Sequence, residues 1–381
     1  MESNLNEIRI LRIISRMNVG GPALQICGIS KNLNKEKFHE LLLTGFCDEN
    51  EVDFLTEMDS QMPVVRIPGF GRKVSILSDG WAFFTLLREI LKYRPHIVHT
   101  HTTKAGVLGR IASIMTFQGH KRVHTYHGHL LFGYFPKFAT HLLTILERVL
   151  ASQTDVLISV GSKVRDDLLN AQIGNAHKYR VVPPGLELTV TESQVEARNA
   201  LGLQINATYF MWIGRVVSIK NPLRVLRIAE ILKGINPLIR ICVAGDGPLL
   251  SEMLRITNNL KLPIDFLGWQ SNIERVLAAS DGLILTSINE GTPLSLIQAQ
   301  MAGKPVISTD VGSVAEVVEN HRSGFVGDFD DQQFAELILM LSKDSTLRQE
   351  MGAFGREFAL KRFSVKRLVN DHENIYRGLI N

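Results

Sequence analysis

The stretch from Glu290 to Pro293 contains the residue types best suited to hold a ligand with hydroxyl and phosphate groups. Glu290 stands directly before Gly291, Thr292 and Pro293, and this order predicts a helix with Thr292 as its cap and Pro293 at its first position. Free amides at a helix start bind phosphate or hydroxyl oxygens, while the carboxylate accepts hydrogen bonds from hydroxyls. Gln298 is predicted about two turns along this helix on nearly the same face, where it would hold a neighbouring part of the ligand.

Two cations follow an earlier apolar run, in the sequence WIGRVVSIKNP. Arg215 stands at the predicted strand end and Lys220 at the start of the next predicted helix, so both can converge on one anion. A planar guanidinium fork and a mobile ammonium together suit a diphosphate that is neutralised without a metal ion. The alternative is that both are ordinary solvated surface residues. A turn at Gly20 and Gly21 offers further phosphate-binding amides, or simply connects a strand to a helix.

Parallel sheets are the elements that would position these residues. Short β-branched runs alternate with amphipathic stretches through both halves of the chain, which is typical of doubly wound α/β domains. The alternation stops at VVPPGLE, residues 181–187, where two prolines and a glycine continue neither element. We therefore predict an N-terminal Rossmann-like domain over 1–183 and a second over 184–360, with a C-terminal helix over 361–381 packing back on the first. Ligands bind at the carboxyl ends of such strands, so the predicted site is a cleft between the domains.

The same alternation predicts the individual elements. Strands are expected at 8–15, 40–45, 97–100, 122–126, 155–160, 208–213, 238–244, 264–266, 282–286 and 305–308. Helices are expected at 22–33, 78–93, 104–116, 137–151, 162–171, 221–233, 248–258, 272–278, 293–302 and 314–319. The tail from 331 to 380 is predicted as two or three helices.

The composition excludes several classes of protein. With 45% apolar and 21% charged residues among 381, neither a disordered chain nor a small binding module is expected. The net charge of +4 is too small for wholesale nucleic-acid binding. Three separated cysteines without a CxxC pair indicate neither disulfides nor a zinc site, and we identify no signal peptide and no membrane-spanning apolar run. We expect a cytoplasmic protein with at most peripheral membrane contact.

Eight short elements, taken in order, resemble the family 4 glycosyltransferases, which are enzymes of the GT-B fold. They are the N-terminal GG turn, HTHTTKAGVLGRIA, HTYHGHLLFGYF, GR followed by KNP, GDGP, FLGW, EGTPLSLIQA and VGSVAEVV. The resemblance implies a retaining, metal-independent transferase that uses a nucleotide-activated sugar and no other cofactor. It also implies that Arg215 and Lys220 bind the donor diphosphate and that Glu290 binds the sugar.

Further donor and acceptor contacts are implied by the same resemblance, which also favours uridine as the base. The residues with these expected contacts are Gly291, Thr292, Pro293 and Leu294 for the sugar and phosphate, Gly20 and Gly21 for the β-phosphate and acceptor, Gly245 of GDGP for the donor, Trp269 near the base, and His127 near the donor sugar. A buried structural role is the alternative for Trp269.

Gln298 is a departure from the family, whose members usually have two glutamates that frame seven residues. An amide still accepts one hydrogen bond from the nucleotide ribose, but the charge-assisted bond is lost, and such a bond is worth roughly 1.5–3 kcal/mol against about 1 for a neutral one. We therefore expect an active enzyme with modestly weaker donor binding. No second carboxylate is evident as a nucleophile, and the resemblance implies attack on the same face as departure, assisted by a donor phosphate oxygen.

A group of histidines raises the question of a metal site. His99 and His101 would share a face of one strand, and His127 and His129 follow another. No HExxH motif or nearby cysteine accompanies them, so zinc is the minority interpretation. His99, His101 and His124 are alternatively packing residues at strand ends.

Residues 72–148 contain eleven Lys and Arg but only three acids, Asp79, Glu89 and Glu147. Basic residues among Phe, Tyr and Leu suit an anionic membrane surface, and they also suit a diphosphate-bearing acceptor. We expect peripheral attachment to the cytoplasmic face of a bacterial inner membrane. The expected acceptor is a glycan, for example a polyprenyl-diphosphate-linked one, in capsule or O-antigen synthesis. The alternative is that these charges are scattered or paired with the domain's own acids.

Two other functions fit the same residues. A nucleotide-sugar epimerase would use His127, Asp246 and Glu290 as acid and base groups around the sugar ring. A non-catalytic nucleotide-sugar-binding partner would be a transferase inactivated by Gln298. The sugar itself is not specified, although the loops at 127–135 and 291–295 are expected to select it.

Overall fold

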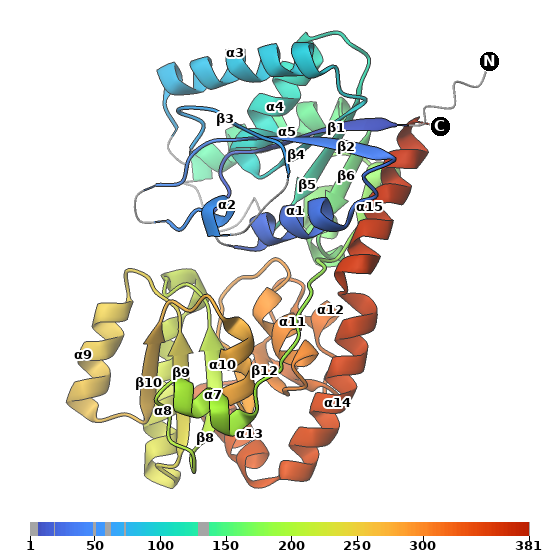
Figure 1. Cartoon of the computed structure of the whole chain (residues 1–381). Helices are drawn as coiled ribbons and strands as arrows, with labels where there is room; N and C mark the ends of the chain where they lie inside the picture. Colours follow the sequence, from blue (N-terminus) through green and yellow to red (C-terminus); the bar gives the residue numbers. More distant parts are fainter. Residues whose placement is uncertain are drawn as a thin grey trace. The chain divides into compact units, whose positions relative to one another are not determined.

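The computed structural model describes residues 7–18, 20–48, 51–57, 62–71, 74–128 and 137–380. Contacts divide the chain into two units, of which unit 1 comprises Met1–Leu186 and Ser364–Asn381, and unit 2 comprises Glu187–Phe363. The unit boundaries fall at Leu186 and Phe363, against 183 and 360 in the prediction. Each unit is built on a parallel sheet with helices on both faces (Figure 1), so the predicted pair of doubly wound domains is confirmed.

Unit 1 contains a sheet in the order β3-β2-β1-β4-β5-β6-β7. Its strands are β1 (Ile8–Ile14), β2 (Phe38–Thr44), β3 (Val64–Arg66), β4 (Ile97–His101), β5 (Lys121–Tyr126), β6 (Val156–Ser159) and β7 (Tyr179–Val181). Its helices are α1 (Gly21–Asn32), α2 (Phe54–Glu57), α3 (Ile76–Tyr93), α4 (Thr103–Met115), α5 (Lys137–Ser152), α6 (Ser162–Asn170), η1 (Ala176–Lys178) and α15 (Val365–Ile380). The strand order reverses between β1 and β4, and ligands of doubly wound sheets bind at such a switch point.

Both faces of the unit 1 sheet are covered by helices, so apolar residues of its strands pack on either side. Leu11, Ile13 and Val98 pack on one face against α3 and α4. Ile10 and Ile97 pack on the other face against α1 and α15. The outer helices of one layer, α3, α4 and α5, leave their remaining sides to the surface.

Unit 2 contains a sheet in the order β10-β9-β8-β11-β12-β13, with its switch point between β8 and β11. Its strands are β8 (Thr208–Ile213), β9 (Ile239–Ala244), β10 (Ile264–Gly268), β11 (Gly282–Leu285), β12 (Val306–Thr309) and β13 (Gly324–Gly327). Its helices are α7 (Gln194–Ala200), η2 (Ser218–Lys220), α8 (Pro222–Ile235), α9 (Leu250–Leu260), α10 (Ile273–Ala279), α11 (Leu294–Met301), α12 (Val314–Val317), α13 (Asp331–Lys343) and α14 (Ser345–Arg362).

Every predicted strand and helix has a counterpart at its position in the structure. The strands β3, β7 and β13 and the helices α2, α7, η1 and η2 were not predicted. The tail forms α13, α14 and α15, and α15 returns to unit 1 as expected. Within the described residues, no helix combines the length and the apolar character that crossing a bilayer requires.

The return of the chain to unit 1 is fixed by hydrogen bonds around the predicted boundary segment. Val365 donates its amide to the carbonyl of Leu186 at 3.1 Å, next to a bridge between Leu186 and Ser364. The Gln25 side chain of α1 accepts from the amide of Gly185 at 2.9 Å and donates to its carbonyl at 3.2 Å. The segment where the chain leaves unit 1 is therefore hydrogen-bonded both to α1 and to the start of α15, where the chain returns.

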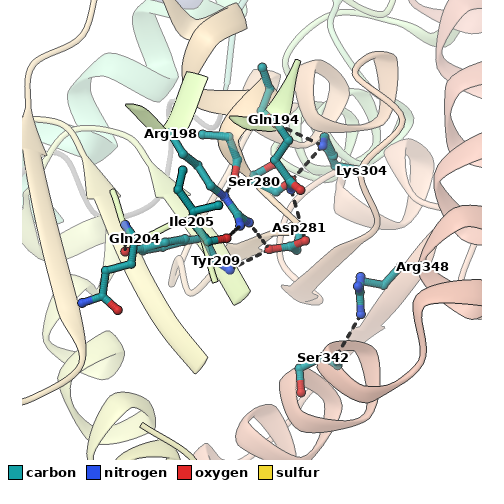
Figure 2. A network of polar contacts seen from close by, with 12 residues as sticks. Gln194, Arg198, Gln204, Ile205, Tyr209, Ser280, Asp281, Lys304, Ser342 and Arg348 are labelled. Carbon is teal, nitrogen blue, oxygen red and sulfur yellow. Dashed lines mark hydrogen bonds and ion pairs between the residues drawn. The ribbon is translucent and has the colours of Figure 1, made fainter. Parts of the chain in front are cut away.

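Asp281, directly before β11, ties α7 to the sheet of unit 2 (Figure 2). Its Oδ2 accepts from Arg198 at 2.6 Å and from the Tyr209 amide at 2.8 Å, and its Oδ1 accepts from Gln194 at 3.2 Å. Lys304 donates to the neighbouring Ser280 carbonyl at 2.7 Å. These contacts lie at the amino ends of the strands, away from the ends that carry ligands, so we interpret them as structural.

Candidate active site

Glu290 lies in the loop after β11 and is bound by two neighbours within unit 2. Its Oε1 accepts from Lys220 Nζ at 2.5 Å and from Ser287 Oγ at 2.6 Å. Glu290 is 9% exposed and the Lys220 side chain 22%, so the pair is largely shielded from water. The structure thus joins two residues that the sequence predicts to bind one ligand, and the role of Ser287 was not predicted.

The loops that carry this pair are fastened together because β8 and β11 are neighbouring strands. Trp212 donates its indole N–H to Thr286 Oγ1 at 3.0 Å, and Thr286 in turn donates to the Lys220 carbonyl at 3.1 Å. Ile288 donates its amide to the Ile219 carbonyl at 2.9 Å. The Lys220–Glu290 ion pair is therefore held from both sides by backbone and buried side-chain contacts.

The loop after β12 supports the backbone of Glu290. Gly312 has φ +58°, and a Cβ added there would lie 1.7 Å from the Glu290 carbonyl oxygen. Ser313 donates its amide to the Gly291 carbonyl at 3.0 Å, and Thr309 donates to the Ser287 carbonyl at 2.8 Å. Only glycine fits at position 312, because both the left-handed backbone and the close approach exclude a side chain. The VGS part of the resemblance therefore positions the glutamate.

Gly245 brings the GDGP loop against the loop that contains Arg215. An added Cβ at Gly245 would lie 1.9 Å from the Gly214 carbonyl oxygen, and Val216 donates its amide to the Asp246 carbonyl at 2.9 Å. Arg215 itself is exposed on this loop. Gly245 thus has a packing reason to be glycine, and its contact with a donor stays a prediction, as does that of Arg215.

The start of α11 differs from the prediction. Pro293 is the N-cap residue in an extended conformation, with ψ 109°, so the helix begins one residue later, at Leu294. The expectation that Thr292 caps the helix is therefore wrong. Gln298 is half-buried within α11, whereas Glu290 precedes the helix, so the expected shared helical face of these two residues is also wrong.

Trp269 follows β10 and is 44% exposed, which rules out the buried structural role. The adjacent Gly268 accepts from the Gly245 amide at 2.7 Å. An open pocket of about 550 Å³ lies near the end of this strand, and Glu187, Asn272 and Glu274 are among its lining residues. Two carboxylates oppose a diphosphate electrostatically, so we do not assign this pocket to the donor phosphates.

In unit 1, Gly20 and Gly21 lie where the sequence places them, at the start of α1, with Gly20 as the N-cap and Pro22 in the first turn. His127 follows β5, and its Nε2 lies 3.0 Å from Nδ1 of His101 at the end of β4. Burial lowers the pKa of His127 to about 4, so both rings are neutral near pH 7 and one donates to the other. Their roles toward a sugar stay predictions.

Behind His101, His99 belongs to a buried polar network. Arg12 donates to its Nδ1 at 3.2 Å, and because arginine only donates, that nitrogen is an acceptor. Nε2 therefore holds the proton and donates to Thr125 at 2.8 Å, while Tyr376 of α15 approaches Nδ1 at 2.8 Å. Arg12 is in turn paired with Glu40 at 2.5 Å.

This network explains most of the histidine group. His99 and His101 share a face of β4, as predicted, with ring centroids 4.1 Å apart. His124 lies on the opposite face and contacts Thr100 at 2.8 Å. In the described part of the chain, no group of three or more His, Cys, Asp or Glu is arranged to hold a metal ion. His129, with the rest of the predicted sugar-selecting loop from 129 to 135, lies outside the described residues.

The buried histidines predict that unit 1 loses stability as the pH falls. Burial lowers the pKa of His372 to about 3, and its Nδ1 donates to the Leu368 carbonyl at 2.9 Å. Between that value and an unfolded-state pKa near 6.5, only the unfolded chain binds the proton. Each such histidine therefore removes up to roughly 1.4 kcal/mol of unfolding free energy per pH unit below about 6.5.

Urea unfolding followed by circular dichroism at pH 7.5 and 5 measures this loss. We expect His372→Gln to flatten the pH dependence, whereas the same change at His141, which is exposed, should leave it as in the wild type. An unfolding free energy that is constant over this pH range would contradict the neutral state assigned to these rings.

Two family models match the chain, "Glycosyltransferase Family 4" over residues 19–190 and "Glycosyl transferases group 1" over residues 193–358. The chain is 26% identical over 334 residues to the Escherichia coli UDP-Gal:alpha-D-GlcNAc-diphosphoundecaprenol alpha-1,3-galactosyltransferase, a match that covers 85% of this chain and 86% of that protein. It is 24% identical over 330 residues to the Staphylococcus aureus capsular polysaccharide biosynthesis glycosyltransferase CapM, covering 81% of this chain and 83% of the relative.

Among solved structures, Anabaena HepE in complex with UDP and glucose matches with a TM-score of 0.82 at 20% identity, over 98% of this chain and 100% of that chain. This likeness shows the fold. The two family models together span nearly the whole sequence, and the geometry joins the residues of the GR-KNP, EGTP and VGS elements in one site. The chain belongs to the family 4 glycosyltransferases and has their GT-B fold.

Proposed function

We propose that the protein is a retaining glycosyltransferase that moves a hexose or N-acetylhexosamine from a UDP-sugar to a hydroxyl of a lipid-diphosphate-linked glycan. The name of the E. coli relative contains both a UDP-sugar and a diphosphoundecaprenol acceptor, and solved neighbours hold UDP or UDP-glucose. The relative CapM supports a place in bacterial surface polysaccharide synthesis. The reaction would run in the cytoplasm, at the membrane that holds the lipid.

The Lys220–Glu290–Ser287 arrangement is the observation that carries this proposal. A cation and a carboxylate stand after neighbouring strands at the switch point of the sheet, which is where doubly wound sheets bind their ligands. In the proposed donor complex, Lys220 turns from Glu290 to the diphosphate, joined by Arg215. Glu290 then accepts hydrogen bonds from sugar hydroxyls while Ser287 keeps its carboxylate in place.

The proposed reaction breaks the bond between the sugar C1 and the diphosphate oxygen and forms one between C1 and the acceptor oxygen on the same face. The acceptor proton passes to a donor phosphate oxygen, so UDP leaves protonated and no other reactant is needed. Charge grows on the diphosphate as C1 acquires oxocarbenium character, and Lys220 and Arg215 stabilise that charge. Gln298 supplies no carboxylate for a covalent intermediate.

Incubation with labelled UDP-sugars tests the proposal. The acceptor is N-acetylglucosamine linked through diphosphate to a short polyprenol, and parallel reactions omit it. Transfer of label to the lipid supports the proposed function. Isomerised UDP-sugar without acceptor would instead identify an epimerase, and tight binding without turnover of any sugar would identify a non-catalytic binding partner.

Activity is expected to persist in excess EDTA, because Arg215, Lys220 and backbone amides take the place of a divalent cation at the diphosphate. The measurement is the initial rate after dialysis against EDTA, compared with the rate in Mg²⁺ or Mn²⁺. A rate that disappears in EDTA and returns only with one of these ions would contradict metal-independent transfer.

A further inference from the structure

Helix α3 is apolar on the side that faces away from the sheet. Its inner residues, Leu86 and Ile90 among them, are fully buried. On the outer side, Leu77, Trp81 and Phe84 are 88%, 67% and 68% exposed, with Leu91 continuing the same stripe. Their spacing of four, three and seven residues places them along one line of the helix. A helix that is apolar on both sides usually has a partner on each, and within the described residues of unit 1 the outer side of α3 is left exposed.

Helix α5 repeats this pattern in the same layer. Phe138, Leu142, Ile145 and Val149 are exposed at spacings of four, three and four residues, so they too form one stripe. Helix α4 contacts both α3 and α5. Residues of α3 and α4 pack on one face of the unit 1 sheet (Figure 1), and Ala151 of α5 packs against Leu157 on that same face. We call the two stripes together the apolar face of unit 1.

The charges on these three helices are segregated by sign. The acidic residues are either buried or paired. Glu147 is buried against Arg110, Glu89 is 8% exposed, and Asp79 forms an ion pair with Lys104 at 2.5 Å. Among the described side chains of these helices, the charges left exposed are all basic, and they are Arg88, Lys92 and Arg148. Part of the basic run predicted from the sequence is therefore neutralised internally, and what remains on the surface beside the apolar face is positive.

We propose that the apolar face of unit 1 inserts shallowly into the surface of an anionic lipid bilayer. Trp, Phe and Leu side chains flanked by Lys and Arg are the combination that lies at the boundary between headgroups and acyl chains. A protein partner would have to cover two separated stripes with matching shape. It would also meet three exposed basic groups and, among the described side chains of these helices, no exposed acid. A bilayer accepts both stripes at once and supplies the negative charge. The inference goes beyond the proposed reaction and needs neither the donor nor the acceptor.

Quenching of Trp81 fluorescence tests insertion directly, because Trp81 is the single tryptophan of unit 1 and Trp212 and Trp269 lie in unit 2. The protein is mixed with sugar-free vesicles of phosphatidylglycerol or phosphatidylcholine whose acyl chains are brominated. We expect co-sedimentation with phosphatidylglycerol, quenching in the bound fraction, and loss of that quenching in Trp81→Phe. At about 0.5 M salt the bound fraction should fall, because attraction to the headgroups is screened, while the molecules still bound remain quenched.

Paired substitutions distinguish vesicle binding through the apolar face from non-specific binding through other exposed apolar residues. Trp81→Ser with Phe84→Ser, or Leu142→Ser with Ile145→Ser, is expected to weaken vesicle binding by at least about tenfold, because exposed apolar groups lose their transfer into lipid. The matched control is Ile235→Ser with Leu238→Ser, two exposed aliphatic residues of unit 2, which should bind as the wild type does. All of these positions are exposed, so circular dichroism and thermal unfolding should be unchanged.

Three results would overturn the inference. One is an absence of binding to either kind of vesicle. Another is binding that the serine variants retain in full. The last is a stable dimer, seen by sedimentation velocity, that these variants dissociate in the absence of lipid, since the apolar face would then be covered by a second copy. The transfer assay is separate, so loss of vesicle binding and loss of the proposed reaction are distinguishable.

Discussion

Glu290→Gln is expected to lower the rate of transfer by about 10²–10³-fold, the range found when one fixed group that stabilises a transition state is removed. The amide keeps the size of the side chain and can still accept from Ser287, but it cannot balance the charge of Lys220 or bind sugar hydroxyls with a full negative charge. Lys220→Ala should cost a similar factor, with an added loss of UDP affinity, because the diphosphate loses a cation.

The measurements are initial rates with the donor identified by the labelled-sugar experiment, and UDP affinity by calorimetry. Glu336→Gln is the matched control, since Glu336 is an exposed carboxylate on α13, and it should keep the wild-type rate. A wild-type rate in Glu290→Gln, with the fold intact, would show that the site is elsewhere.

Arg110→Ala should destabilise unit 1 by roughly 3–5 kcal/mol, the usual cost of leaving a buried charge without its partner. Arg110 of α4 donates to both oxygens of Glu147 of α5 at 2.7 Å, and its Nε donates to the Gly106 carbonyl at 2.7 Å. Tyr126 of β5 donates to Glu147 at 2.9 Å. The arginine and glutamate are 1% and 0% exposed, so water cannot replace the lost partner.

The double variant Arg110→Met, Glu147→Leu separates charge from packing. It removes both charges and keeps much of the volume, so it should be closer to the wild type than Arg110→Ala. Urea unfolding gives the free energies for all three proteins. If Arg110→Ala unfolds at the wild-type urea concentration, this ion pair does not stabilise the layer formed by α4 and α5.

The sequence predicts the fold well because both faces of each sheet are buried, so central strands such as β1 and β9 have apolar residues on both faces. The strands that were not predicted, β3, β7 and β13, are all at sheet edges and have three or four residues. An edge strand of three or four residues is too short to show a periodic pattern of apolar residues. The edge strand β10, which has five residues, was predicted.

The site was predictable as far as residue type reveals chemistry. A charged residue beside a glycine-proline turn marks Glu290, and two cations after a strand mark Arg215 and Lys220. Ser287 and Gly312 were not assigned roles, because a serine near a strand end and a glycine in a loop are common in any sequence. Their roles depend on which loops meet across β11 and β12, and that is set by strand order. The Arg12–His99–Tyr376 network could not be predicted from the sequence either, since Arg12 and His99 lie far from Tyr376 along the chain.

The return of α15 to unit 1 also fixes an order of events during synthesis. On the side of the unit 1 sheet that α15 covers, Ile10, Phe38 and Val123 pack against Leu368, Val369 and Tyr376 of that helix. These three residues of α15 are translated only after the whole of unit 2. At about 5–20 residues per second, the ribosome needs roughly ten to forty seconds to add unit 2 before α15 emerges. Throughout that interval the nascent N-terminal sheet keeps an uncovered apolar surface. Unit 2, whose elements are continuous in sequence, is free to complete its own core first.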